Sequence, residues 1–257
     1  IGTTSRNLGV PRSTKDLSLT FNYNDIPSLE KLFNENPGQI ACVIIEPIGI
    51  EEPDSLFLET VKELAHKNSA ILIFDELKTG LRFALAGVQE YTGVIPDIST
   101  FGKAIANGYP LSAIVGKRDI MEYVDKTFFS FTFGGETLSL VACLKTIEIV
   151  QKKGVIKHNW GIGSYFKEKY NKLIKEYKLE NYLWNKGYDI HFVTEFESGD
   201  GFTDFELKSL VHQEMVSRGN LTIGSYEFCY SHTKEMIDQT INDIDEILKT
   251  VTQAIKE

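Results

Sequence analysis

The hydrophobic positions in the first half of the chain alternate between segments with helical spacing and short continuous runs. Apolar residues recur at helical spacing in residues 28–36 and 55–67, which predicts two amphipathic helices. Continuous apolar runs at 39–45 and 70–74 predict buried strands. Strands that are apolar on both faces and alternate with helices indicate an α/β fold, with a mostly parallel sheet covered by helices. Shorter strand-like pieces follow at 98–101, 111–115 and 127–130.

The pattern changes near residue 150, where longer amphipathic helices replace the short apolar runs. This change predicts a smaller C-terminal α+β domain, so we assign residues 1–150 to a large domain and residues 151–257 to a small one. Helices are expected at 138–152, 155–177, 204–217 and 233–255, with two alternating strands near 188–195 and 221–229.

Composition and charge narrow the possible partners. Hydrophobic residues make up 42% of the 257 residues and charged residues 25%, which is ordinary for a folded globular protein. The net charge of −9 disfavours binding to a nucleic-acid backbone. No apolar run is long enough to span a bilayer, and no signal peptide opens the chain. The three cysteines are widely spaced and form no CxxC pattern. We therefore expect reduced cysteines in a cytoplasmic protein.

Several familiar site types are excluded by their spacing. No two histidines are four residues apart and no Cys/His cluster has zinc spacing, so we expect no metal site. The Gly102-Lys103 pair is not part of a P-loop, because position 97 is Asp97 and the residue after the lysine is Ala104. The chain also has no GxSxG elbow and no GxGxxG fingerprint.

Lys103 and Asp75 are the first two candidates for chemistry. A lysine amine in a partly desolvated site forms a Schiff base with an aldehyde, and Gly102 beside it lets a bulky cofactor approach the backbone. Asp75 ends the apolar run at 70–74, where a carboxylate can pair with a protonated ring nitrogen of a cofactor. The alternatives are a surface lysine on a turn and a helix-capping or surface carboxylate. The gap between the two residues fits one strand–helix–strand passage, so both can reach one crevice.

Thr132 is the third candidate. It lies in the sequence FTFGGET at 131–137, a glycine turn directly before a predicted helix. A hydroxyl group and backbone amides in such a turn suit a phosphate. The alternative is a plain loop that caps the helix.

Together these segments resemble the class III pyridoxal-phosphate aminotransferases. Within that class the sequence is most similar to glutamate-1-semialdehyde 2,1-aminomutase and to related aminotransferases of bacterial surface-sugar pathways. The resemblance is most specific between residues 44 and 137. The matching stretches follow the family's order: IIEP at 44–47, ILIFDELKTGLR at 71–82, QEY at 89–91, GVIPD at 93–97 and TFGKA at 100–104.

The resemblance implies fold type I and a role for each matching residue. Lys103 would form the internal aldimine with pyridoxal 5'-phosphate and later shuttle protons, while Asp75 would pair with the pyridine nitrogen. Leu77 would lie against the face of the ring. Thr132 would bind the cofactor phosphate, usually from the neighbouring subunit. The resemblance therefore implies a homodimer with its site at the subunit interface, and the first domain as part of the cofactor-binding large domain.

The implied reaction moves an amino group between a small-molecule amino donor and a keto or aldehyde compound. The segment after Glu46-Pro47 is shorter than in the aminomutase, which favours transfer between two molecules; the intramolecular aminomutase reaction is the alternative. Glu136 stands where relatives often have Asn. Family members also carry an N-terminal stretch with part of the phosphate loop, so we expect this chain to be a fragment of a longer enzyme. A non-catalytic partner, or one half of a split enzyme, is the other alternative.

Overall fold

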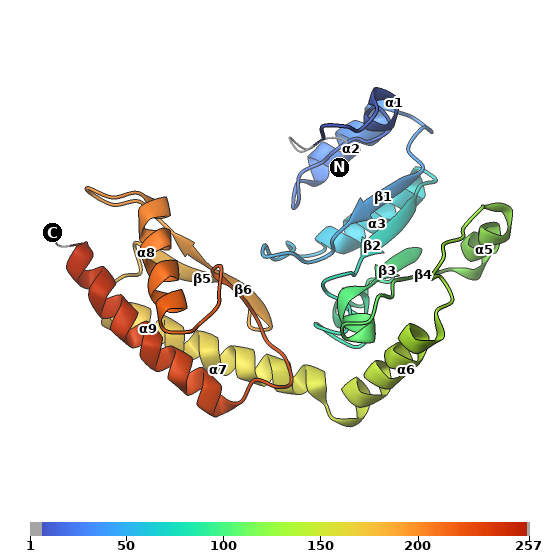
Figure 1. The fold of residues 1–257 in the computed structure, drawn as a ribbon. Helices are drawn as coiled ribbons and strands as arrows, with labels where there is room; N and C mark the ends of the chain where they lie inside the picture. The colour runs from blue at the N-terminus through green and yellow to red at the C-terminus, as the bar shows by residue number, and fades with distance from the viewer. Residues whose placement is uncertain (1–6, 256–257) are drawn as a thin grey trace.

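A four-stranded sheet forms the centre of the N-terminal half of the protein (Figure 1). The computed structural model describes residues 7–255. The strand order is β1-β2-β3-β4; the first three strands are parallel, and β4 is antiparallel to β3. The expected α/β fold with a mostly parallel sheet is confirmed. The strands are β1 (Cys42–Ile45), β2 (Ile71–Asp75), β3 (Ile98–Phe101) and β4 (Ala113–Gly116).

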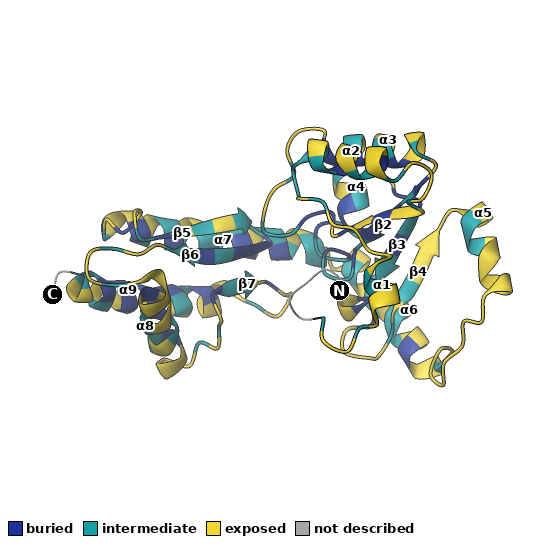
Figure 2. Cartoon of the chain, turned by 90° about the horizontal axis from the view of Figure 1, so that it is seen from above, coloured by how far each residue is buried: buried dark blue, intermediate teal, exposed yellow. Residues whose placement is uncertain are grey.

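The two faces of this sheet differ in how far they are covered. One face carries Val43 and Ile45 of β1 beside Leu72 and Phe74 of β2, and all four pack in a core with α2 (Ile26–Glu35) and α3 (Phe57–Lys67). Figure 2 shows these two helices on the same side of the strands. On the opposite face Ile44 is 59% exposed. The alternation along β2 places Asp75 on this less covered face, at the carboxyl end of the strand.

Capping residues explain where several helices begin. Asp25, Glu136 and Thr233 each accept backbone hydrogen bonds at the start of the helix that follows, and Thr203 forms a capping box with Glu206. Such a cap contributes about 1 kcal/mol. The remaining helical segments of the N-terminal half are α1 (Arg12–Lys15), α4 (Val88–Thr92), the 3₁₀ turn η1 (Lys103–Ala106), α5 (Arg118–Met121), the 3₁₀ turn η2 (Glu122–Lys126) and α6 (Thr137–Lys152).

The C-terminal half contains a second sheet and three helices. Its strands run antiparallel in the order β5-β6-β7. Its core includes Phe166, Tyr170, Leu183 and Phe192, all of which are buried. The elements are α7 (Val155–Glu176), β5 (Leu183–Tyr188), β6 (His191–Phe196), α8 (Asp204–Ser217), β7 (Ser225–Glu227) and α9 (Lys234–Ala254).

The turn between β5 and β6 joins the two halves. Ile190 in this turn is fully buried in the core of the N-terminal half, and the Tyr188 ring lies edge-on to Phe83 with their centroids 5.1 Å apart. From α7, Trp160 Nε1 donates a hydrogen bond of 3.1 Å to the carbonyl of Phe83. The C-terminal half is therefore held against the segment that follows β2.

Three strand predictions are wrong in detail, whereas the helix predicted at 204–217 coincides with α8. Residues 127–130 form a loop in which Phe128 is 96% exposed, because a strand needs a neighbour to pair with and none pairs there. The strand predicted at 188–195 is instead the end of β5, a turn and β6. The strand predicted at 221–229 is reduced to the short β7, which follows Gly224 with its φ of +83°.

Candidate active site

Asp75 and Thr100 lie side by side at the carboxyl ends of β2 and β3. The two residues are register partners, and Glu76 N donates a hydrogen bond of 3.0 Å to Thr100 O. Asp75 Oδ1 accepts hydrogen bonds from Leu77 N at 3.1 Å and from Thr100 Oγ1 at 3.4 Å. Asp75 Oδ2 accepts none from residues 7–255. The carboxylate is therefore held by one oxygen, and the other remains available to a ligand.

Lys103 begins η1, two residues after β3 ends. Its φ of +47° lies in the left-handed region, which costs a non-glycine residue on the order of 1–3 kcal/mol and is concentrated at functional sites. The side chain is exposed, and within the described part of the chain its amine makes no ion pair or hydrogen bond. The strained backbone thus presents an unpaired amine near the edge of the sheet that carries Asp75.

Leu77 and two glycines pack these segments closely together. A side chain at Gly102 would meet Leu77 Cδ2 at 3.2 Å, and one at Gly80 would meet Phe101 Cδ1 at 2.5 Å. The chain after Asp75 therefore folds back over the residues that lead into Lys103. Leu77 supplies an apolar surface there, and the absence of a Cβ at Gly102 leaves room for it.

Glu76 fixes the turn after Asp75 from inside the protein. It is fully buried and accepts hydrogen bonds from Thr79 Oγ1, from Val88 N at 3.0 Å and from Gln89 N at 3.0 Å. Burial raises the pKa of Glu76, although these hydrogen bonds act in the opposite direction. A buried carboxylate between two segments positions Asp75 and Leu77 without touching a ligand itself.

Thr132 does not join this group within one chain. It lies in the exposed loop between η2 and α6, and no hydrogen bond links it to another residue of the described range. Its neighbour Glu136 caps α6, accepting hydrogen bonds from Leu138 N at 2.6 Å and Ser139 N at 2.8 Å. The structure thus places Asp75 and Leu77 beside the segment that leads into Lys103, and leaves Thr132 at the surface.

An ion-pair cluster lies next to this segment, and the sequence analysis did not predict the contacts between its members. Glu227 Oε2 on β7 lies 3.1 Å from Arg82 Nη2, and Glu227 Oε1 lies 3.6 Å from Lys78 Nζ and 3.5 Å from His191 Nε2. Burial, and then the charge of Lys78, lower the pKa of His191 to about 4 against the opposing effect of Glu227. Arg82 and Glu227 are 145 residues apart in the sequence, so no local pattern signals their contact.

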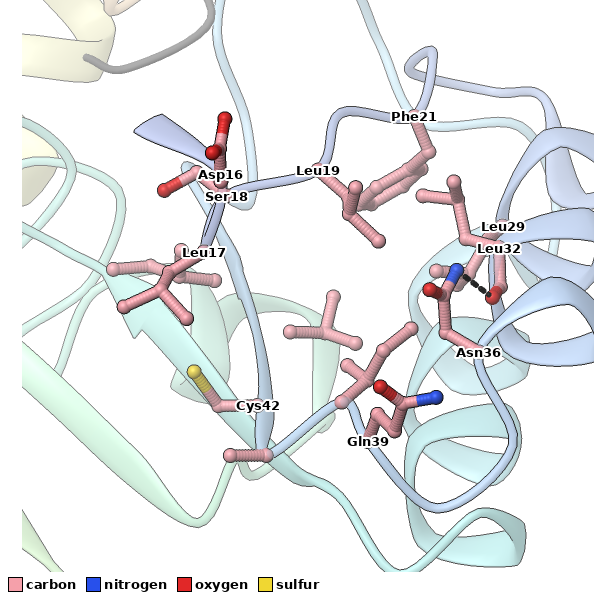
Figure 3. Close-up of a pocket in the computed structure, with 14 residues that line it drawn as sticks. Asp16, Leu17, Ser18, Leu19, Phe21, Leu29, Leu32, Asn36, Gln39 and Cys42 are labelled. Carbon is pink, nitrogen blue, oxygen red and sulfur yellow. Dashed lines mark hydrogen bonds between the residues drawn. The ribbon is translucent and has the colours of Figure 1, made fainter. Parts of the chain in front are cut away.

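Other features of the described residues do not offer a competing site. A cavity of about 520 Å³ lies between residues 16–21, α2 and β1 (Figure 3). Its walls are mainly apolar, with Leu17, Leu19, Phe21 and Leu29 among them, and it contains none of the candidate residues. Within residues 7–255, three or more His, Cys, Asp or Glu side chains never gather as they would around a metal ion. No helix in that range combines the length and apolarity needed to cross a bilayer.

The fold is that of the pyridoxal-phosphate-dependent transaminases. The internal aldimine form of the FumI protein from Sphingopyxis sp. MTA144 superimposes with a TM-score of 0.88 at 22% identity, over 97% of this chain and 61% of that one. An omega-transaminase from Sphaerobacter thermophilus superimposes with a TM-score of 0.81 at 20% identity, over 98% of this chain and 63% of that one.

The sequence defines the family more narrowly. The model of the class III aminotransferases matches residues 10–202, so the chain belongs to this family. A 3-aminobutyryl-CoA aminotransferase from Cloacimonas acidaminovorans (strain Evry) is 33% identical, in an alignment that covers 96% of this chain and 61% of the relative. The chain therefore spans about three fifths of the length of these relatives.

The residues around Lys103 fit the cofactor of this family, pyridoxal phosphate. The cofactor needs an amine for its aldehyde, an anionic acceptor for its ring N–H and an apolar surface for its ring. Lys103 has an amine without a partner in the described range, and Asp75 has an uncommitted carboxylate oxygen there. Leu77, packed over Gly102, has the apolar surface. These three residues therefore suit the aldehyde and the ring of the cofactor. None of them is suited to bind its phosphate group.

Proposed function

We propose that this chain is the main part of a pyridoxal-phosphate-dependent aminotransferase, which moves an amino group from an amino donor to a keto or aldehyde acceptor. The observation that carries the proposal is the position of Asp75 and Lys103 near one edge of the sheet, each with a group left without a protein partner in residues 7–255. Ligands of open α/β sheets bind at this carboxyl edge.

Each residue then has a separate task. The cofactor supplies an aldehyde carbon and a ring that withdraws electrons. Lys103 Nζ would hold that carbon, and the same amine would serve as the base that moves a proton to and from the substrate carbon. Asp75, whose Oδ2 has no partner in residues 7–255, would accept a hydrogen bond from the ring N–H and keep that proton in place. Leu77 would orient the ring, and Thr100 holds Asp75 in position.

Transfer between two molecules is favoured over the intramolecular aminomutase reaction. The short segment after Pro47 supports this choice. The 33% identical relative is named as an aminotransferase, and from its name we extend only that reaction type to this chain. The special likeness to glutamate-1-semialdehyde aminomutase remains a prediction.

Borohydride trapping tests the proposal directly. The protein is incubated with pyridoxal phosphate, reduced with borohydride, digested and analysed by mass spectrometry. We expect the cofactor mass on the peptide that contains Lys103, because reduction makes the bond between amine and aldehyde permanent. The exposed Lys126 in η2 is the internal control and should remain unlabelled. Labelling spread evenly over the lysines, in the complete protein as well as in this chain, would falsify the proposal.

We also propose that the enzyme is a homodimer in which Thr132 binds the cofactor phosphate of the partner subunit. The exposed loop and the following helix present large apolar side chains, including Phe128 (96% exposed), Phe133 (73%) and Leu144 (70%). Monomeric proteins rarely leave so much apolar surface in contact with water. If this loop crosses the dimer interface, Thr132 binds the cofactor phosphate in the active site of the partner subunit.

Mixing two variants that are each impaired at limiting cofactor tests the shared site. Lys103→Ala removes the amine, and Thr132→Ala is expected to weaken cofactor binding about 10- to 100-fold. In a mixed dimer both lesions fall on one site and the other site is intact, so a reassociated mixture should recover about a quarter of the wild-type activity at limiting cofactor. Each variant alone is the control. A mixture no more active than the average of the two would show that Thr132 serves its own chain or has no role.

A further inference from the structure

We propose that Gln89 is a positioning residue for amino transfer, because its side chain holds β3, the strand that leads into Lys103, in place against the end of β2. The inference rests on the proposed function, since it concerns the geometry of that same site. Gln89 begins the QEY stretch at 89–91, which is part of the family resemblance and contains none of the residues proposed to hold the cofactor.

Two hydrogen bonds of Gln89 connect the ends of β2 and β3. Gln89 N donates to Glu76 Oε1 at 3.0 Å, and Glu76 directly follows β2. Gln89 Nε2 donates at 3.0 Å to Oγ of Ser99, which lies on β3 in register with Phe74 of β2. We refer to these two contacts as the Gln89 bridge. It joins the two strands through α4, in addition to the ladder of hydrogen bonds between them.

Glu76 keeps the backbone at Gln89 in a fixed position. Helix α4 begins at Val88, and its N-cap residue, Gly87, has no side chain to accept the first N–H groups. The carboxylate of Glu76 accepts two of them, from Val88 N and Gln89 N, each at 3.0 Å. A Cβ atom at Gly87 would collide with the same carboxylate, so the helix start packs closely against it. The side chain of Gln89 therefore reaches Ser99 from an anchored helix.

The far end of the Gln89 bridge lies behind the candidate active site. Ser99 is buried and is paired with Phe74, whose side chain belongs to the core on the covered face of the sheet. The next residue, Thr100, lies on the opposite face and is paired with Asp75. The Gln89 bridge and the hydrogen bond between Thr100 and Asp75 therefore hold the same end of β3 from its two faces.

Lys103 depends on this support because its own side chain has none. Its amine makes no ion pair or hydrogen bond within residues 7–255, so its position follows from the backbone between β3 and η1. The register pairs of β2 and β3 end at Thr100. Beyond it, Leu77 packs against Gly102, but an apolar contact of this kind has no preferred direction. A shift of β3 is therefore passed on to the lysine.

Loss of the Gln89 bridge should lower the rate more than the affinity for substrate. Without the hydrogen bond to Ser99, the end of β3 shifts relative to Asp75, and the amine of Lys103 shifts with it. A displacement of about 1 Å lowers a rate on the order of 100-fold. We expect a smaller displacement here, with kcat about tenfold lower. KM should change little, because the bridge lies on the face of β3 opposite to Asp75.

The rate at which borohydride can trap pyridoxal phosphate on Lys103 tests the inference without turnover. The complete protein, freed of cofactor, is mixed with pyridoxal phosphate, samples are reduced at successive times, and the labelled peptide is quantified by mass spectrometry. We expect Gln89→Met and Ser99→Ala each to slow both the labelling and kcat about 5- to 20-fold. The melting temperature should fall by only about 2–4 °C, because Gln89→Met keeps the backbone N–H that Glu76 accepts. Gln213→Met, at an exposed position of α8, is the matched control and should slow neither rate.

The double variant distinguishes one shared hydrogen bond from two separate effects. If Gln89 and Ser99 act through the same bond, the double variant should be no slower than the slower single variant, whereas independent effects would multiply. Multiplied effects, or labelling as fast as in wild type in both single variants, would overturn the inference. A large fall in melting temperature with an unchanged labelling rate would likewise assign the bridge to stability alone. Absence of labelling at Lys103 in the wild-type complete protein would instead remove the proposed function, and the inference with it.

Discussion

Replacement of Lys103 by alanine is expected to lower kcat by about 10⁴-fold, measured as steady-state amino transfer with saturating pyridoxal phosphate. The variant loses both the amine that binds the cofactor's aldehyde and the base that moves the substrate's proton. Two other lysines of the N-terminal half are already engaged, since Lys78 lies beside Glu227 and Lys117 pairs with Asp97. The fold should persist, since the Lys103 side chain is exposed.

Two further measurements separate chemistry from charge at this position. Lys103→Arg keeps the positive charge but not a nucleophilic amine, so it should be as inactive as the alanine variant. Added methylamine should partly restore turnover to Lys103→Ala, because a small amine can enter the vacated space and accept the proton. Lys126→Ala, an exposed lysine in η2, is the matched control. An alanine variant that kept a tenth of the wild-type rate would show that Lys103 is not the catalytic base.

The parts of the fold and of the site that depend on local sequence patterns can be predicted from the sequence. The apolar run at 70–74 predicts β2, because a strand buried on both faces needs no alternation. That strand and the one before Lys103 then place Asp75 and Lys103 towards one edge of the sheet, since parallel strands share their carboxyl ends. β5 is missed because its sequence LWNKGY mixes polar residues with a glycine and has only one fully buried side chain, Leu183.

Contacts between distant segments could not be predicted in the same way. The Arg82–Glu227 pair joins β7 to the segment after β2, and the packing of the β5–β6 turn and of Trp160 on Phe83 brings them together. The aromatic residues at 127–130 predict a strand by composition, yet a strand also depends on a partner that composition does not reveal. The sequence therefore does not predict how the two halves of the protein contact each other.

Asp97 connects several elements of the N-terminal half, and its loss should destabilise the fold. Its carboxylate accepts hydrogen bonds from Leu72 N at 2.7 Å and from Lys117 Nζ at 2.7 Å, and lies 2.8 Å from His66 Nε2. These contacts join β2, the start of β3, the end of β4 and α3. Asp97→Ala leaves the Leu72 N–H buried without an acceptor, so we expect the free energy of unfolding to fall by about 2–4 kcal/mol. Chemical denaturation measures the change.

Two further variants show which contact of Asp97 accounts for the lost stability. Asp97→Asn keeps an oxygen that can accept from Leu72 N, so it should lose about half as much as the alanine variant. Lys117→Met removes only a half-exposed partner and should cost less than about 1 kcal/mol. If Lys117→Met lowers the free energy of unfolding as much as Asp97→Ala does, the effect comes from the ion pair and not from the buried hydrogen bond to Leu72 N.

The pH dependence gives an independent check on the same carboxylate. Burial alone would raise the pKa of Asp97, but the hydrogen bonds from Lys117, Leu72 N and His66 outweigh it and lower the pKa. A group whose pKa is lower in the folded state stabilises the protein above its unfolded pKa, about 3.9 for Asp. That contribution disappears as the pH falls through the folded value. The stability difference between wild type and Asp97→Ala should therefore be constant near neutrality and shrink below about pH 4. A difference that persisted unchanged into acid would mean that the hydrogen bonds do not favour the charged form of Asp97.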